Sequence, residues 1–437
     1  MRNPLKDIVT RQKNNDLMGV YSACSANPYV IETVLEHAKK EHYFALIEST
    51  ANQVNQFGGY IGMTPKDFRD SVYEIANKVG IDKRQIILGG DHLGPLVWVK
   101  EDAENAMAKA AVLIEAYVLA GYTKIHIDTS MKLATDLSEK DIQDQLIVER
   151  AAFLAERAQA AFMKYKKSFP DAVTPVFVIG SEVPIPGGVA EEEEMHITNP
   201  SDLTQTIDDY KKAFLEKDLA DIWENVIAIV VQPGVEFGND SIHEYHRESA
   251  RDLTNELKKF PNLVFEGHST DYQTKEKLRE MVEDGVAILK VGPQLTFALR
   301  EVLYLLELCE VNIVEDTSKR SNFKNVLETA MLNSPEHWKN HYFGTLQEQQ
   351  FYRSYSYSDR CRYYLSNSFV EEAIQCLLGN LQEQIPLMLL SNYLPRQYQK
   401  IREGKLVNCA DDIIKDYLFE VLDDYLYATR QSELMIE

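Results

Sequence analysis

Short apolar stretches recur along the first two thirds of the chain, separated by longer amphipathic segments. Each apolar stretch is nearly continuous rather than alternating, which is typical of parallel strands buried on both faces. The amphipathic segments between them have the spacing of helices. The stretches lie at 18–24, 43–48, 86–95, 124–128, 175–180, 226–231, 263–271 and 286–293.

Eight strands that alternate with helices predict a (β/α)8 TIM barrel of the α/β class. Such barrels use about 250 residues, and this one would end with a helix over 295–308. An open doubly wound sheet is the alternative, but no early glycine-rich dinucleotide fingerprint supports it. We therefore expect a barrel domain over residues 1–310.

Local signals mark several helix ends. Pro28 and Pro65 suit the first position of a helix, and Thr64 suits the capping position before Pro65. Gly121 suits a helix stop. These residues predict helices that begin at 28 and 65, and one that ends near 120.

Beyond residue 310 the pattern changes to helices without intervening buried strands. Helical patterns appear at 325–332, 369–381 and 410–427, and tyrosines are dense around 352–357 and at 363–364. We expect a helical C-terminal region, 311–437, packed on the barrel without a low-complexity linker. Its tyrosine-rich segment could also reach over the barrel mouth or form an oligomer interface.

Composition narrows the partners. The chain has 437 residues, 45% of them hydrophobic and 26% charged, with a net charge of −22. This charge argues against nucleic acid or an anionic membrane as the main partner, although a local cluster of amides and cations could still bind a small phosphorylated substrate. The five cysteines are scattered, and no apolar run approaches the ~20 residues of a membrane span. We expect reduced thiols, no signal peptide and a cytoplasmic location.

Polar side chains stand at the carboxyl ends of nearly all eight predicted strands. In a parallel barrel these ends converge on one face, where active sites of this fold are built. A carboxylate at the rim can instead cap a helix or pair with a lysine, and both interpretations stay open for Glu48 and Gln232. The run 191–194 is most simply a solvated loop face. The strand-end residues are Ser22, Glu48, Asp91, His92, His126, Asp128, Glu182, Gln232, Glu236, Glu266, His268 and Lys290.

Two histidines on well-separated strands, His92 and His268, together with Glu182, predict a site for a divalent ion such as Zn, Mn, Ni or Co. Such an ion would polarise a carbonyl or bind an enediolate. Asp91, beside His92, is the best candidate to move a proton. The loops after the last two strands, with Ser269 and Thr270, are where barrels often hold phosphate.

Several motifs resemble those of one family, the non-catalytic, Z-type subunits of class II D-tagatose-1,6-bisphosphate aldolase. The resemblance runs from the first strand to near the C-terminus. It implies a barrel related to class II ketose-bisphosphate aldolases. The motifs are at 52–60, 89–95, 124–128, 180–184, 231–237, 268–273, 289–293 and 356–360.

The resemblance also assigns roles to residues. Asp91 and His92 match the base and the first metal ligand of class II aldolases, and His268 matches the ligand on the seventh strand. The sixth strand departs from that pattern, because the aldolase histidine there corresponds to the region of Gln232. The departure fits either a weakened aldolase or a site recast for another reaction.

The family implies two functions. Our main hypothesis is a metal-dependent C4-epimerase that interconverts fructose and tagatose, free or phosphorylated, and acts as a homo-oligomer. The alternative is a non-catalytic subunit that stabilises and activates a separate catalytic tagatose-bisphosphate aldolase subunit. For the enzyme we expect His92, Glu182 and His268 at the metal and Asp91 as one acid/base. The second acid/base would be Glu266 or Asp128. The expected substrate-binding residues are Gln53, His126, Gln232, Ser269, Thr270 and Lys290.

Overall fold

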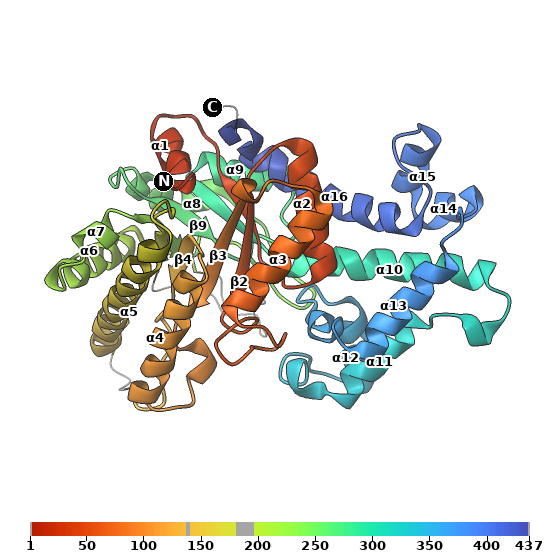
Figure 1. The fold of residues 1–437 in the computed structure, drawn as a ribbon, viewed down its shortest axis with the longest axis horizontal. Coiled ribbons are helices and arrows are strands. Elements are labelled where there is room, and N and C mark those ends of the chain that lie inside the picture. The colour runs from red at the N-terminus through yellow and green to blue at the C-terminus, as the bar shows by residue number, and fades with distance from the viewer. Residues whose placement is uncertain (1, 137–139, 181–195, 436–437) are drawn as a thin grey trace.

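The predicted barrel is present. The computed structural model describes residues 2–136, 140–180 and 196–435, and its eight parallel strands close into a ring in the order β1-β10-β9-β6-β5-β4-β3-β2 (Figure 1). All eight predicted strands are therefore confirmed, together with the fold class. The strands are β1 (Val20–Ala23), β2 (Ala45–Thr50), β3 (Ile86–Leu93), β4 (Lys124–Ile127), β5 (Val176–Ile179), β6 (Val226–Val231), β9 (Val264–Gly267) and β10 (Val286–Val291).

Helices cover the outside of the ring, as the right-handed βα crossover requires. A two-stranded hairpin, β7 (Glu236–Phe237) with β8 (Ile242–His243), follows β6. Among the described residues, no helix combines the length and the apolar character that crossing a membrane demands. The outer helices are α2 (Pro28–Glu41), α3 (Pro65–Val79), α4 (Ala103–Leu119), α5 (Lys140–Ser168), α6 (Pro200–Glu216), α7 (Ala220–Trp223), α8 (Arg247–Leu257) and α9 (Lys275–Glu283).

The predicted helix starts at 28 and 65 are confirmed. The Asn27 side chain accepts hydrogen bonds from the first amides of α2. Thr64 and Asp67 form a reciprocal capping box at the start of α3, so both orphan amide groups there are satisfied. These caps fix the points where the β1 and β2 loops enter their helices, and both loops border the site described below.

A short helix, α1 (Leu5–Lys13), covers the amino-terminal end of the barrel. Its Leu5, Ile8 and Val9 pack with the apolar side chains that fill the barrel interior. The Asn3 side chain donates to the carbonyl oxygens of Thr123 and Thr174, just before β4 and β5. Apolar packing therefore closes this end, and the polar strand ends lie at the other.

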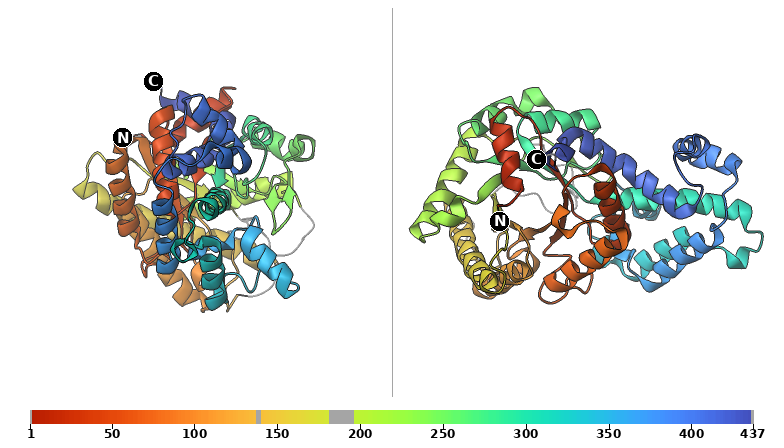
Figure 2. Two further views of the ribbon diagram at one scale, coloured as in Figure 1. Left: turned by 90° about the vertical axis from the view of Figure 1, so that its right-hand side faces the viewer. Right: turned by 45° about the horizontal axis from the view of Figure 1, so that its top comes forward.

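The C-terminal region is helical, as predicted, and much of it projects to one side of the barrel (Figure 2). Its first helix extends beyond the predicted range because no glycine or proline interrupts it between 294 and 313. The region also holds the short 3-10 turns η4 (Pro335–His337) and η5 (Arg360–Tyr364). Its helices are α10 (Pro293–Ile313), α11 (Phe323–Asn333), α12 (Leu346–Tyr355), α13 (Ser368–Asn380), α14 (Leu387–Tyr393), α15 (Pro395–Arg402) and α16 (Ala410–Thr429).

The last helix, α16, returns to the barrel and packs against α2, α9 and α10. The carbonyl oxygen of Thr429 accepts from the Gly19 amide at 2.8 Å, and the Gln431 side chain accepts from the Tyr21 amide at 2.8 Å. The Tyr425 and Tyr21 rings lie 5.7 Å apart. The C-terminal segment thus takes part in the wall around β1. The division predicted at 310/311 stays a prediction, and it falls inside α10.

Candidate active site

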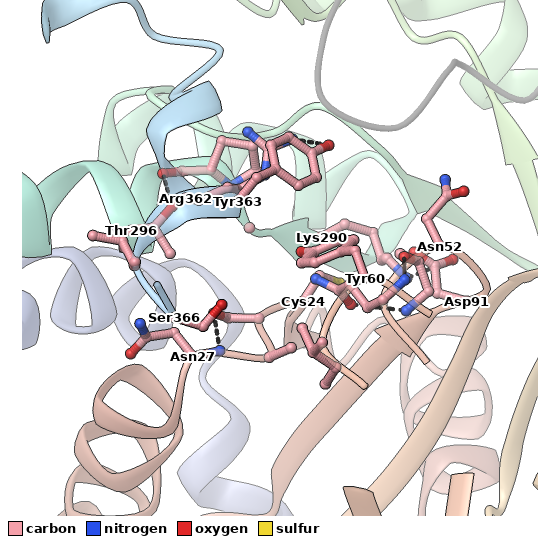
Figure 3. A pocket seen from close by; sticks show the side chains of 18 of the residues that line it. Cys24, Asn27, Asn52, Tyr60, Asp91, Lys290, Thr296, Arg362, Tyr363 and Ser366 are labelled. Atoms are coloured by element: carbon pink, nitrogen blue, oxygen red, sulfur yellow. Dashed lines mark hydrogen bonds and ion pairs between the residues drawn. The ribbon is translucent and has the colours of Figure 1, made fainter. Parts of the chain in front are cut away.

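A cavity of about 330 Å³ opens at the carboxyl ends of the strands. Asp91 and His92 line it from β3, Lys290 from β10, and His268 from the segment after β9. Arg362 and Tyr363 of the C-terminal η5 line its other side, so both parts of the chain build one pocket (Figure 3). A volume of this size suits a small organic ligand.

The end of β3 is shaped by two close contacts. A side chain at Gly89 would place its Cβ 2.6 Å from Cγ of Glu48, and one at Gly94 would place it 1.7 Å from the carbonyl oxygen of Asp128. Between these glycines, His92 has φ +48°, in the left-handed region. Non-glycine residues rarely adopt that conformation, and such strain is concentrated at functional sites.

Two buried lysines hold three carboxylates below the pocket. Nζ of Lys124 lies 2.7 Å from Oε1 of Glu48 and 2.7 Å from Oε2 of Glu266. Nζ of Lys290 lies 2.6 Å from Oε2 of Glu48 and 2.9 Å from Oδ1 of Asp91. Because carboxylates outnumber the ammonium groups, the network favours a further positive charge nearby.

Three histidines form a compact triangle above this network. The ring centroids of His92, His126 and His268 are 4.9 to 5.2 Å apart. Each ring has one nitrogen beside a carboxylate: Nδ1 of His92 at 2.9 Å from Asp128, Nδ1 of His126 at 2.8 Å from Asp91, and Nε2 of His268 at 3.0 Å from Glu266. A carboxylate can only accept, so we assign a proton to each of these nitrogens. The amide of His92 lies 3.2 Å from Nδ1 of His126, and with this assignment it donates to Oδ1 of Asp91 at 3.0 Å instead. The other nitrogen of each ring then keeps a lone pair.

This arrangement fits a divalent metal ion. Nε2 of His126 is buried without a hydrogen-bond partner in the described part of the chain. Ligand atoms of Asp91, His92, His126 and His268 all lie within 4.8 Å of one another. Histidine ligands oriented by carboxylates are the usual second-shell pattern of protein metal sites, and three histidines with an open position suit Zn²⁺ or a similar ion.

Electrostatics divide the roles of the pocket residues. Burial raises the pKa of Asp91, but the charges of His92 and Lys290 outweigh it and hold that pKa well below its usual range. Burial lowers the pKa of His268 to about 4. At neutral pH Asp91 is therefore ionised and His268 is neutral. Burial lowers the pKa of His92, but Asp91 and Asp128 outweigh this effect and raise it, so a metal ion would have to displace a proton from the His92 ring.

The structure brings several of the predicted site residues to the cavity and places others behind it. Gln53 and Ser269 line the cavity with Asp91, His92, His268 and Lys290. Asp128, Glu266 and His126 are buried behind the lining. The Gln232 side chain accepts from the amides of Gly234 and Val235, and the Thr270 hydroxyl donates to the carbonyl oxygen of Lys290. Glu182 lies outside the described residues.

Some residues of the pocket were not predicted. Tyr60 follows β2, and its ring lies 4.8 Å from that of Tyr363. Arg362 was also not predicted. The tyrosine-rich segment was expected to pack on the barrel, with a position over the barrel mouth or at an oligomer interface as alternatives. The density of tyrosines was the sequence feature that could have indicated this side of the pocket. It does not show which residues of the segment line the cavity.

Fold and site together define a (β/α)8 barrel with a candidate metal site at the carboxyl ends of its strands. A family model described as "D-tagatose-1,6-bisphosphate aldolase subunit GatZ/KbaZ-like" matches residues 5–430, and the chain belongs to this family. The predicted family is thereby confirmed.

Individual proteins similar to this chain cover nearly its whole length. Two relatives, each called D-tagatose-1,6-bisphosphate aldolase subunit GatZ, come from Escherichia coli strains SMS-3-5 / SECEC and O1:K1 / APEC. Each is 42% identical over 425 residues, which covers 97% of this chain and 99% of the relative. A crystal structure described as a probable tagatose 6 phosphate kinase from Sinorhizobium meliloti 1021 is 40% identical. It covers 94% of this chain and 100% of its own, with a TM-score of 0.84.

Proposed function

We propose that this protein is a subunit of a D-tagatose-1,6-bisphosphate aldolase that supports a separate catalytic subunit. The observation that carries this proposal is the 42% identity to the GatZ subunits over 97% of this chain and 99% of theirs. The match leaves no large part of either chain unaccounted for. This was our alternative hypothesis from the sequence, and the comparisons favour it over the epimerase.

The candidate site supports a bound divalent ion, with His92, His126 and His268 as ligands. We put His126 in the place that the sequence gave to Glu182. When bound, the ion would polarise a sugar carbonyl or stabilise an enediolate. Asp128, Asp91 and Glu266 would orient the three rings, and Lys290 would meet a negatively charged or hydroxyl oxygen in the cavity.

A second candidate function is the C4 epimerisation of a ketohexose or its phosphate. The observation that favours it is an ionised carboxylate, Asp91, that lines an open cavity next to the histidine triangle. A purely supporting subunit needs no such group. Epimerisation at C4 needs bond cleavage or proton transfer on both sides of the carbon, and Asp91 would serve one side.

Co-purification with a catalytic class II tagatose-bisphosphate aldolase subunit tests the main proposal. The cleavage rate of tagatose 1,6-bisphosphate and its half-life at 37 °C are compared with and without this chain. We expect a faster and longer-lived activity with it. No change in either quantity would refute the supporting role. Light scattering on the purified chain would report whether it forms a homo-oligomer.

The variant Asp91→Asn separates the two candidates. A supporting subunit should keep its effect on the catalytic partner when Asp91 is neutralised. An epimerase should lose the conversion of fructose, fructose 6-phosphate or fructose 1,6-bisphosphate to the tagatose forms. That conversion is assayed with the purified chain alone and Zn²⁺, Mn²⁺, Ni²⁺ or Co²⁺. Wild-type protein that makes no tagatose product with any of these metals would exclude the epimerase.

A further inference from the structure

The pocket has a cationic side that belongs to the C-terminal region. Arg362 and Tyr363 of η5 line the cavity together with Lys290 and Asp91 of the barrel. In Figure 3, Arg362 and Tyr363 lie on one side of Lys290, and Asp91 lies on the other. We propose that Arg362 binds the phosphate group of a phosphorylated ketose whose sugar end lies at Lys290 and the histidines.

Arg362 forms no ion pair with a carboxylate of the described residues. Its guanidinium donates to the carbonyl oxygens of Ser358 and Asp359 and to the Tyr363 hydroxyl. No carboxylate of the described residues lies within ion-pair distance of it. The buried Arg300 differs, since it pairs with Asp359 at 2.9 Å. Among the described residues, Arg362 is therefore held in place by neutral groups and has no anionic partner.

A second arginine strengthens the positive potential. Arg360 donates to the carbonyl oxygen of His337 and lies over the Tyr363 ring, 5.3 Å from its centroid. It too has no ion pair in the described part of the chain. Burial raises the pKa of Tyr363, yet the charges of the two arginines more than offset this and lower it. A positive patch of this kind is unusual in a chain with a net charge of −22 and indicates anion binding.

Two acidic side chains also line the cavity, but one of them, Asp271, already accepts hydrogen bonds from backbone amides. Glu371 and Asp271 line the pocket. Oδ1 of Asp271 accepts from the amides of Gly292 and Gln294 at 2.9 and 2.8 Å, at the start of α10. Its carboxylate therefore faces the helix amides.

Because Asp271 accepts from these amides, we place the phosphate site elsewhere than at the start of α10. Barrels of this fold often bind phosphate at the loops after the last two strands and at a helix N-terminus. Here Asp271 already satisfies those amides of α10, and Asn27 satisfies the first amides of α2. Among the described residues that line this cavity, the cation available to a phosphate beyond the paired Lys290 is Arg362. That the ligand is a ketose follows from the proposed function, and the inference rests on that function for the sugar. The phosphate site itself is argued from Arg362.

Isothermal titration of the purified full-length protein tests the inference with fructose 6-phosphate, fructose and inorganic phosphate. Wild-type protein should bind fructose 6-phosphate at least about 10-fold more tightly than fructose, and inorganic phosphate should compete. In Arg362→Gln this preference should disappear. Arg362→Lys should keep part of it, because it retains the charge and loses the two-pronged contact.

Arg402→Gln is the matched control. Arg402 is exposed, donates to the Tyr398 hydroxyl and lies over the Tyr398 ring, so it resembles Arg362 but is remote from the cavity. This variant should bind like wild type. Equal binding of fructose 6-phosphate by wild type and Arg362→Gln would overturn the inference. If Arg362→Gln fails to fold, unaltered affinity in Arg362→Lys or equal affinity of wild type for fructose and its phosphate would overturn it instead.

The outcome is independent of the subunit assay. A phosphate preference that depends on Arg362, in a chain that does not help a catalytic partner, would refute the proposed function and leave the phosphate site. Help for the partner without any phosphate preference would refute the site alone.

Discussion

Oδ1 of Asp91 lies 2.8 Å from Nδ1 of His126, and with the proton assigned to Nδ1 the buried Nε2 of His126 keeps a lone pair that has no partner among the described residues. The same oxygen lies 2.9 Å from Nζ of Lys290. Asp91 therefore orients His126, a candidate metal ligand, with its Oδ1. Among the ion pairs of the described residues, the shortest contact of the other oxygen, Oδ2, is 3.7 Å to Nε2 of His92. Orientation and proton transfer can thus use different oxygens of one carboxylate.

His126→Asn should lower the affinity for a divalent ion by at least about 10-fold, because it removes one of three proposed ligands. Metal content after purification and the visible absorption of Co²⁺-loaded protein measure this without reference to activity. His246→Asn, at an exposed histidine, is the control and should keep full metal content. Full metal content in His126→Asn would contradict the assignment and restore Glu182 as the candidate third ligand.

Lys124→Met should destabilise the protein by about 3–5 kcal/mol, because it leaves Glu48 and Glu266 buried beside each other with one cation fewer. Urea unfolding measures the change. Lys66→Met removes an exposed ion pair with Asp70 and should cost no more than about 1 kcal/mol. Equal losses in the two variants would show that the buried network does not depend on Lys124.

Glu236 should make stability depend on pH. Burial raises its pKa to about 7, whereas an exposed glutamate titrates near about 4.3. Between these values the folded state keeps a proton that the unfolded state has released, so the free energy of unfolding falls as pH rises. The fall is at most on the order of 3 kcal/mol.

Unfolding of Glu236→Gln between pH 4.5 and 7.5 checks this expectation. The variant should lose less stability over the range than wild type does. Glu244→Gln, at a nearby exposed position, should follow the wild-type curve. Parallel curves for wild type and Glu236→Gln would contradict the raised pKa.

Gln431→Ala should cost about 1–3 kcal/mol, since it leaves the buried amide of Tyr21 without its acceptor. Thermal or urea unfolding measures the loss. Gln399→Ala, at an exposed glutamine that contacts Glu403, should stay within about 0.5 kcal/mol of wild type. A neutral Gln431→Ala would mean that the C-terminal segment adds little to the barrel wall.

The strands of the barrel could be predicted because each is buried on both faces and so reads as a continuous apolar run. Asp91, His92 and Lys290 could be predicted for the same reason. A polar residue at the carboxyl end of a buried strand lies at the rim of the barrel. Residues such as Arg362 could not be found this way. Its place in the cavity depends on how η5 packs against the barrel, and no local pattern encodes that contact.

The histidine triangle shows a second limit. The strand pattern placed His126 and Asp128 at the end of one predicted strand, but it could not show that each pairs with a residue of β3. The crossed contacts, His92 with Asp128 and His126 with Asp91, depend on the register between two strands more than thirty residues apart. Register is a tertiary property, so the sequence left His126 as a substrate contact.

The bond between Tyr21 and Gln431 joins positions 410 residues apart. At a translation rate of about 5–20 residues per second, Gln431 is synthesised roughly 20 to 80 seconds after Tyr21. Until then β1 lacks part of its cover, and the apolar surface that α16 buries, including the ring of Tyr21, stays exposed to other chains. This protein is therefore expected to need protection by a chaperone during synthesis, most of all in the interval before α16 emerges.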